Sequence, residues 1–449
     1  MKKILIIGAG LAGCEAAYQI TKRGIPVILC DIKPENRTPA HSSADFAELV
    51  CSNSLKSEAQ DNAHGLLKAE LRILDSLILR IAGQCRVPAG TSLSVDREAF
   101  ARAVNAEIKN NPLIETACAE ATDIPEVSDG DKSASSAPSA VIIATGPLTS
   151  PALLCALQRV CGNENLAFYD AAAPIIFEES IDKTICFPGS RWGKGGADDY
   201  LNCPFTREQY DAFYDALTNA PTAVLKPFET PGVFEGCMPV EVLAKRGRDA
   251  LRFGPARPVG FTYPDGYLHN NSELKRPYAI AQLRREKAAG LLYNIVGFQT
   301  NLTFPAQRKV FRLIPGLENA EFARYGVMHR NAYLNAPLVL DKFSMLKSRP
   351  GVFIAGQLSG VEGYVESTAS GLIAGINAAR LVSGLPPAAP GPVTMTGALM
   401  NYLVTASPKK FQPMNANFGI LPPIDVRRKD ERYAAFYRRA MEQITYFER

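Results

Sequence analysis

The chain has 449 residues, of which 47% are hydrophobic and 21% charged, and its formal net charge is +4. This length allows two or three globular domains, and the composition excludes collagen-like and intrinsically disordered chains. No run of about 18 apolar residues occurs, so the sequence predicts no membrane-spanning helix. Lys2 and Lys3 lead directly into an apolar strand, and we therefore expect no signal peptide.

Cysteine and histidine usage bears on the compartment and on metal chemistry. The sequence has ten cysteines and four histidines. No two cysteines form a CxxC motif, and several cysteines lie within apolar runs, which is typical of reduced thiols in the cytoplasm. The histidines show no metal-ligand spacing. We therefore expect a cytoplasmic protein without a bound metal.

The first 31 residues carry a dinucleotide-binding pattern. Apolar runs at 3–7 and 26–30 predict buried parallel strands, with a helix over 14–23 between them. A Gly-x-Gly-x-x-Gly pattern precedes the helix, and its glycines suit a tight turn, a nearby pyrophosphate and close helix packing. An acid at the end of the second strand can bind a ribose. The expected cofactor-binding residues here are Gly8, Ala9, Gly10, Leu11, Ala12, Gly13 and Asp31.

Two later strands are expected to join the same sheet. Residues 140–146 and 351–357 are apolar runs that contain a glycine near the strand end, where open α/β sheets bind ligands. A helix with a Ser/Thr start is expected over 367–380, and its N-terminus would face the electron-rich end of a cofactor. The further cofactor-binding residues expected are Gly146, Gly356, Gln357 and Gly371.

The middle of the chain differs in character. Within 186–319, short strand-like runs alternate with loops, and one helix is expected over 206–218 with Thr206 as its N-cap. We therefore expect an α/β protein. Its Rossmann-like domain would combine residues 1–185 and 320–449, interrupted by an inserted α+β domain over 186–319 that faces the substrate.

Longer motifs match a known family. One is Gly360-Val-Glu-Gly-Tyr-Val-Glu-Ser-Thr-Ala-Ser-Gly371, and others lie at 39–41, 48–55, 169–174, 200–204, 234–241, 292–300, 324–331 and 411–419. On these motifs the chain resembles the folate- and FAD-dependent tRNA (uracil-5-)-methyltransferases, relatives of the glucose-inhibited division protein A family. The resemblance covers nearly the whole chain. It departs at Asp31, where the family usually has Glu, and in a longer Ser-rich segment at 125–139.

The resemblance implies a cofactor and an activity. It implies that the Rossmann-like domain binds FAD. It also implies that the enzyme forms 5-methyluridine in the T loop of tRNA, with 5,10-methylenetetrahydrofolate as carbon donor and NAD(P)H as reductant. The partners expected are the T arm of tRNA, folate and NAD(P)H, with no membrane. The family's two reactive cysteines match Cys51 and Cys237.

Cysteine suits this chemistry for a physical reason. C5 of uracil is a poor nucleophile until a thiolate adds to C6, and a deprotonated cysteine is strongly nucleophilic. Lys245, Arg246 and Arg248 follow Cys237 closely and would lower its pKa. Because Cys237 lies in the inserted domain, which is best placed to present the base, we assign the attack on C6 to Cys237 and a supporting role to Cys51.

Other functions stay open. Basic residues of the insertion such as Arg248 and Arg252, with Phe253 and Tyr278 nearby, would suit RNA, but a ribosomal RNA uridine would suit the same chemistry. The sister family that modifies wobble uridine carries a long helical C-terminal extension, and this chain ends soon after Phe418. A plain NAD(P)H–FAD oxidoreductase and a non-catalytic RNA-binding flavoprotein are the remaining alternatives.

Overall fold

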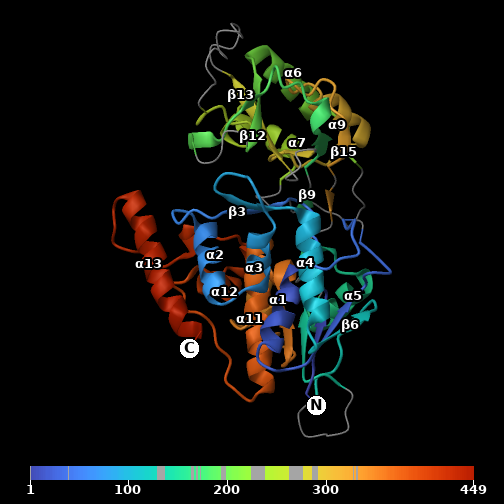
Figure 1. Ribbon diagram of the computed structural model, residues 1–449, viewed down its shortest axis with the longest axis vertical. Coiled ribbons are helices and arrows are strands. Elements are labelled where there is room, and N and C mark those ends of the chain that lie inside the picture. The colour runs from blue at the N-terminus through green and yellow to red at the C-terminus, as the bar shows by residue number, and fades with distance from the viewer. Residues whose placement is uncertain are drawn as a thin grey trace.

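The chain forms two lobes, which Figure 1 shows one above the other. The computed structural model describes residues 2–38, 40–128, 137–162, 166–167, 170–171, 173–193, 199–223, 238–261, 277–285, 292–326, 328–329 and 332–448. Both the first and the last described segments belong to the lower lobe, so the chain leaves this lobe and returns to it.

A parallel sheet forms the centre of the lower lobe. Its order is β18-β7-β1-β2-β6, and each neighbouring pair is parallel. The strands are β1 (Ile4–Ile7), β2 (Val27–Asp31), β6 (Ile114–Cys118), β7 (Ala140–Ile143) and β18 (Val352–Ile354). The expected α/β class with a Rossmann-like sheet is confirmed: β7 returns beside β1, and β18 joins the same sheet beside β7.

Helices cover this sheet and extend from it. They are α1 (Leu11–Thr21), α2 (Ala63–Ile73), α3 (Leu77–Gln84), α4 (Arg97–Asn110), α5 (Pro151–Cys161), α10 (Ala336–Val339), α11 (Tyr364–Val382), α12 (Met395–Thr405) and α13 (Lys429–Glu448). Helix α13 packs against α2 at the side of the lobe (Figure 1).

Two helices begin earlier than the sequence pattern predicted. Helix α1 begins at Leu11 rather than at residue 14, because Gly10 already takes the N-cap position. Helix α11 begins at Tyr364 rather than at residue 367. Gly363, at φ +116°, is its N-cap and makes no side-chain cap. The shift places Tyr364 and Glu366 in the first turn of α11.

The upper lobe is built on an antiparallel sheet. Its order is β11-β12-β13-β14-β10-β15. The strands are β10 (Ile175–Phe177), β11 (Phe187–Pro188), β12 (Tyr200–Phe205), β13 (Ala279–Arg285), β14 (Leu292–Ile295) and β15 (Phe322–Arg324), and the helices are α6 (Arg207–Asn219), α7 (Val240–Ala244) and α9 (Phe304–Phe311). Thr206 caps α6 as predicted, in a reciprocal capping box with Gln209.

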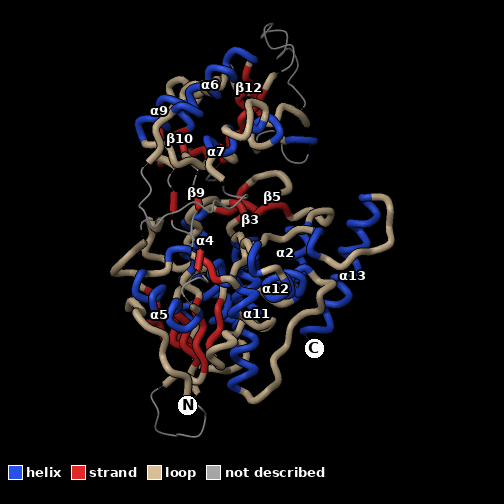
Figure 2. The backbone as a smooth tube through the Cα atoms, turned by 180° about the vertical axis from the view of Figure 1, so that it is seen from behind, coloured by secondary structure: helices blue, strands red, loops and turns tan. Residues whose placement is uncertain are grey.

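Short strands form three smaller sheets. They are β3 (Ser54–Ser57), β4 (Arg86–Val87) and β5 (Ser92–Val95) in one sheet, with the pairs β8 (Leu166–Ala167) with β17 (Tyr333–Leu334) and β9 (Asp170–Ala171) with β16 (Met328–His329). Figure 2 shows β3 and β5 on the side of the lower lobe that faces the upper lobe. The residues just before β3 therefore lie at the junction of the lobes.

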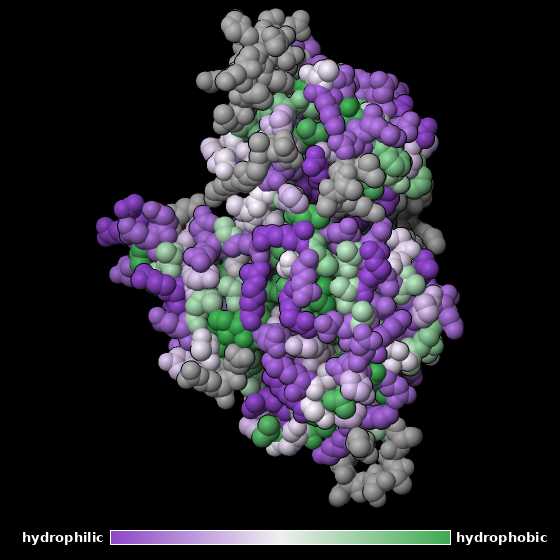
Figure 3. All heavy atoms as spheres, in the orientation of Figure 1, coloured by the Kyte–Doolittle hydropathy of each residue, from purple (hydrophilic) through white to green (hydrophobic). Residues whose placement is uncertain are grey.

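Buried apolar side chains form two separate cores, one in each lobe. Hydrophilic residues cover most of the molecular face in Figure 3. Strands β10 and β15 belong to the upper sheet although they lie outside 186–319. We therefore propose that the inserted domain extends further out, to about residues 174 and 326, than the boundaries at 185 and 320 expected from the sequence.

Candidate active site

The glycine-rich turn between β1 and α1 is enclosed at two of its three glycines. A Cβ on Gly8, whose φ is +103°, would lie 2.5 Å from the carbonyl oxygen of Ala144, and a Cβ on Gly13 would overlap the carbonyl oxygen of Gly8. At Gly10, by contrast, an added Cβ would meet no described atom within 4 Å. No described side chain caps the helix there, which leaves the first N–H groups of α1 to an anionic ligand.

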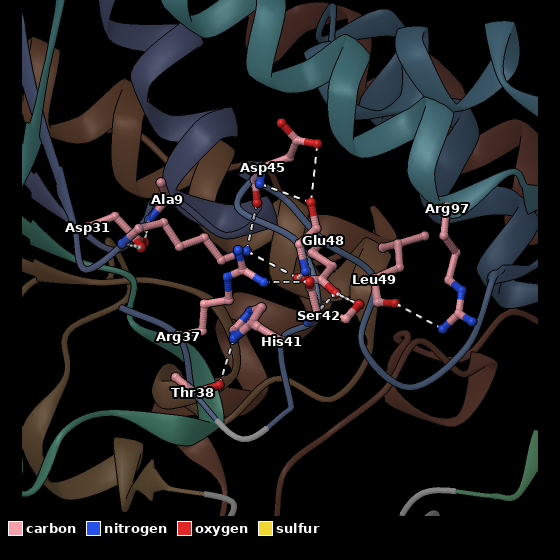
Figure 4. Close-up of polar contacts among 12 residues, drawn as sticks. Ala9, Asp31, Arg37, Thr38, His41, Ser42, Asp45, Glu48, Leu49 and Arg97 are labelled. Atoms are coloured by element: carbon pink, nitrogen blue, oxygen red, sulfur yellow. Dashed lines mark hydrogen bonds and ion pairs between the residues drawn. The ribbon is translucent and has the colours of Figure 1, made fainter. Parts of the chain in front are cut away.

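Asp31 closes this turn from the end of β2. Its Oδ2 accepts a hydrogen bond from the N–H of Ala9 at 2.6 Å (Figure 4), and its Oδ1 accepts one from the N–H of Lys33 at 2.9 Å. A carboxylate has about four lone-pair positions, so both oxygens keep capacity for a ribose hydroxyl. The shorter Asp side chain thus fits the role that the sequence pattern assigned to it.

The segment after β2 folds beside the same turn. The buried Lys33 ammonium contacts the Glu48 carboxylate at 3.2 Å, and the N–H of Ala47 donates to the carbonyl of Ala9 at 2.9 Å. Burial alone would raise the pKa of Glu48, but hydrogen bonds from Ser42 and Ser43 and the Lys33 charge hold this pKa below its ordinary value. These contacts hold the segment after β2 in place beside the glycine-rich turn (Figure 4).

The ends of β7 and β18 meet the first turn of α1. Gly146, at φ +67°, has no described atom within 4 Å of its Cβ position. A Cβ on Gly356 would lie 3.1 Å from the Cβ of Ala12, and Gln357 donates to the Glu362 carboxylate at 3.2 Å. Three strand ends therefore converge at the edge where α/β sheets bind ligands.

Gly371 has a different environment from the other predicted glycines. It lies in the middle of α11, where an added Cβ would overlap the carbonyl oxygen of Ala12. Gly375, one turn later, faces Ala16 in the same way, with its Cβ position 2.8 Å from the Ala16 Cα. The small residues let α11 cross α1 closely, so helix packing accounts for Gly371.

Cys51 lies in a half-buried loop directly before β3. Its backbone N–H donates to the phenol oxygen of Tyr364 at 2.7 Å, and the N–H of Ser52 donates to the same oxygen at 3.1 Å. Burial and the charge of Cys51 raise the pKa of Tyr364 well above its ordinary value, so the phenol stays protonated. Helix α11 thus fixes the Cys51 loop through its first residue.

The upper lobe holds the same loop from the other side. Arg284, near the end of β13, donates from Nη2 to the Ser52 hydroxyl at 2.5 Å, and Asn53 donates to the carbonyl of Arg285 at 3.1 Å. Arg324, at the end of β15, donates to the carbonyl of Val50 at 2.9 Å. The two guanidinium groups therefore bind the residues on either side of Cys51 and hold the loop against the upper lobe.

A second buried group ties α11 to the lower lobe. Glu366 is fully buried, and its Oε1 accepts from the His64 ring at 3.1 Å and from the N–H of Ala416 at 3.0 Å, with the Lys56 ammonium at 3.5 Å. Burial alone would raise the pKa of Glu366, but the Lys56 charge and the His64 hydrogen bond outweigh it and hold the pKa at about 2.

Several residues singled out in the sequence are not part of this arrangement. Cys237 lies outside the described residues. Arg248 pairs with Asp211 at 2.6 Å and with Asp215 at 2.7 Å, and Arg252 pairs with Asp249 at 2.6 Å. Those two arginines form ion pairs within the upper lobe and are therefore less available to bind RNA phosphates than the sequence suggested.

Three partners of the Cys51 loop were not predicted from the sequence: Tyr364, Arg284 and Arg324. Only the alternation of β13 carried a signal, since polar Gln282 and Arg284 alternate with the buried Ala281 and Leu283.

In the described part of the chain, no cluster of three or more His, Cys, Asp or Glu side chains could hold a metal. No helix there is long and apolar enough to cross a membrane.

Comparisons with known proteins match this chain over most of its length. The family model described as "Glucose inhibited division protein A" matches residues 3–386. A protein of Desulforudis audaxviator named methylenetetrahydrofolate--tRNA-(uracil-5-)-methyltransferase TrmFO is 53% identical, over 98% of this chain and 97% of that protein. A protein of the same name from Bacillus anthracis is 52% identical, over 98% of each.

Solved structures show the same fold at low identity. The structure of Aquifex aeolicus GidA in its form I crystal superposes with a TM-score of 0.67 at 17% identity, covering 99% of this chain and 76% of that one. The form II crystal gives the same TM-score at 16% identity, covering 99% and 73%. At these identities the likeness concerns the fold alone.

Proposed function

Because the chain belongs to the glucose inhibited division protein A family, we propose that it methylates C5 of uracil in tRNA. The carbon donor is 5,10-methylenetetrahydrofolate, the reductant is NAD(P)H and the resident cofactor is FAD. The observation that carries this proposal is the full-length likeness, at 51–53% identity, to proteins named for that reaction. It is supported by a dinucleotide cradle and a cysteine loop next to each other in the fold.

The residues at the carboxyl edge of the parallel sheet fit FAD. The open side of Gly10 and the N-terminus of α1 suit a pyrophosphate, and the Asp31 carboxylate suits a ribose. Gly146 and Gly356 add the ends of β7 and β18 to the same edge. When bound, the flavin supplies the hydride that reduces the transferred one-carbon group to a methyl group.

The protein's own part in the reaction is thiol chemistry and base placement. A thiolate forms a bond to C6 of uracil, and the electron pair of the C5–C6 double bond moves to C5. C5 then bonds to the one-carbon group as that group's bond to its carrier breaks, C5 loses its hydrogen as a proton, and the thiolate is expelled from C6. We assign the attacking thiolate to Cys237 and a supporting role to Cys51. The two guanidinium groups and Tyr364 hold the Cys51 loop in place for that role.

The proposal extends to the target and the compartment. We propose the T arm of tRNA as the methylated site and the inserted domain as the part that presents it. A cytoplasmic location is supported by the cysteines, since none of the nine described forms a disulfide. Ribosomal RNA methylation by the same chemistry, and a plain NAD(P)H–FAD oxidoreductase, are the alternatives that an assay has to separate.

Release of tritium from RNA labelled at C5 of uridine separates them. Holoenzyme is incubated with methylenetetrahydrofolate, NAD(P)H and either unmodified tRNA or ribosomal RNA. The proposal predicts tritium release from tRNA that requires both the folate and the reductant. Release from ribosomal RNA alone would favour the first alternative, and NAD(P)H oxidation that is indifferent to RNA would favour the second.

A further inference from the structure

One face of strand β13 is polar and begins at the Cys51 loop. Gln282 and Arg284 are half-buried, whereas Ala281 and Leu283 between them belong to the core of the upper lobe. Their partners on β12, Asn202 and Tyr200, extend the same face. At one end of this face Arg284 donates to Ser52, beside Cys51.

An arginine and a tryptophan lie at the other end of this face. Arg191 donates from Nε to the Gln282 side chain at 2.8 Å. Gln282 is two residues from Arg284, about 7 Å along the strand, and both side chains point to the same side. Trp192 directly follows Arg191, so its backbone lies near the Gln282 end of this polar face. A few nucleotides of RNA are long enough to reach from there to the Cys51 loop.

Trp192 is exposed at a backbone position that is costly for a bulky residue. Its side chain is 64% exposed, and its φ of +61° is left-handed. Its N–H donates to the carbonyl of Gly260 at 2.5 Å, and a Cβ on Gly260 would lie 2.7 Å from the indole ring. Such backbone strain is found preferentially at ligand-binding sites.

The charges around Trp192 are positive. The Arg191 guanidinium lies 4.8 Å above the Phe261 ring. Burial, together with the Arg257 charge nearby, lowers the pKa of Arg191 to about 10, so Arg191 stays charged at neutral pH. No carboxylate among the described residues pairs with either, unlike Arg248 and Arg252.

We propose that Trp192 stacks on an unpaired base of the RNA close to the target uridine, with Arg191 and Arg257 contacting its phosphates. This inference rests on the proposed function, because it places the RNA along the polar face of β13 with the target at the Cys51 end. An exposed aromatic ring beside arginines that no described carboxylate pairs is the combination that suits single-stranded RNA, where a base stacks and the backbone is neutralised.

The sequence provides a direct probe, since Trp192 is the single tryptophan of the chain. Holoenzyme is titrated with unmodified tRNA while indole fluorescence and the anisotropy of end-labelled tRNA are recorded together. We expect the fluorescence to be quenched with the same midpoint as the anisotropy change. A fully paired RNA duplex and vesicles of phosphatidylglycerol should leave it unchanged. Unquenched fluorescence at saturating tRNA, or quenching by vesicles instead, would overturn the proposal.

Variants give a second, independent measurement. Trp192→Ala should raise the Kd for tRNA about tenfold, as expected for one lost stacked base, and Trp192→Phe should restore most of it. Tyr446→Ala removes an equally exposed aromatic ring from α13 and should not change Kd. NAD(P)H reduction of the flavin should be normal in all three. An unchanged Kd in Trp192→Ala would contradict the stacking role.

The outcome can be told apart from failure of the proposed function. If tRNA quenches Trp192 but no tritium is released, the surface binds RNA and the methylation proposal fails. If tritium is released while the fluorescence does not respond, methylation holds and the stacking proposal fails.

Discussion

The backbone N–H of Cys51 donates a 2.7 Å hydrogen bond to the phenol oxygen of Tyr364, 313 positions later in the sequence. The contact joins the loop before β3 to the first residue of α11, whose N-terminus lies just after the last strand of the parallel sheet. The Cys51 loop is therefore hydrogen-bonded directly to the helix that begins beside the cofactor-binding edge of the sheet.

Tyr364→Phe removes the acceptor for two neighbouring N–H groups. Leaving such groups unsatisfied costs about 1–3 kcal/mol each, so the loop should shift. We expect methyl transfer to fall about 10- to 100-fold while FAD content stays normal, measured by single-turnover kinetics and flavin absorbance. Tyr214→Phe removes one hydrogen bond, to Ala244 in the upper lobe, and is the matched control. Wild-type turnover in Tyr364→Phe would show that the loop does not need this contact.

The glycines of the turn should respond differently to one added methyl group. Gly10→Ala meets open space, so the apoprotein should keep its melting temperature but lose at least tenfold in FAD affinity. Gly13→Ala overlaps the carbonyl of Gly8 and should destabilise the fold itself, by about 1–3 kcal/mol. Gly83→Ala, in open space on α3, is the control for both measurements. Full flavin content in Gly10→Ala would contradict the cradle.

The Gly8–Asp31 unit could be predicted from sequence because every part of it is local. A strand, a turn, a helix and an acid follow one another within thirty residues, and hydrophobic period and glycine spacing determine them. The N-cap role of Thr206 was readable for the same reason, since a cap acts within three residues.

The surroundings of Cys51 could not be predicted in this way. Tyr364, Arg284 and Arg324 are far away in sequence, and each reaches the loop only because two sheets pack at the lobe junction. A lone basic residue on a strand carries no sign of its partner. Arg248 and Arg252 were expected to be available to RNA. In the folded chain, each pairs with at least one neighbouring aspartate, which the sequence pattern did not indicate.

Glu366 gives the protein a pH-dependent source of stability. Its folded pKa of about 2 lies below the ordinary 4.5, so its contribution is present above pH 4.5 and is lost as pH falls toward 2. The difference corresponds to about 3 kcal/mol at neutral pH. Glu366→Gln should therefore lower the urea midpoint at pH 7, and this deficit should shrink below pH 4.5.

Glu98→Gln, at an exposed position of α4, should show no such deficit at any pH. A deficit in Glu366→Gln that stays constant from pH 7 to pH 3 would contradict the role of the ionised carboxylate.

Cys51→Ala and Cys237→Ala should each abolish methyl transfer while FAD remains bound, because C5 stays unreactive until a thiolate adds at C6. A T-loop RNA containing 5-fluorouracil should trap the adduct, since fluorine cannot leave as a proton does. Peptide mapping should then place the crosslink at Cys237. A crosslink at Cys51 would reverse the two roles, and normal turnover by Cys237→Ala would remove the thiol mechanism.

The most direct measurement follows the transferred carbon itself. Unmodified tRNA is incubated with holoenzyme, NAD(P)H and methylenetetrahydrofolate carrying 13C in its methylene group, and the digested nucleosides are analysed by mass spectrometry. We predict one 5-methyluridine per tRNA, located in the T loop and carrying the 13C label. A tRNA that remains unmethylated while NAD(P)H is oxidised, or a methyl group without the label, would contradict the proposed reaction.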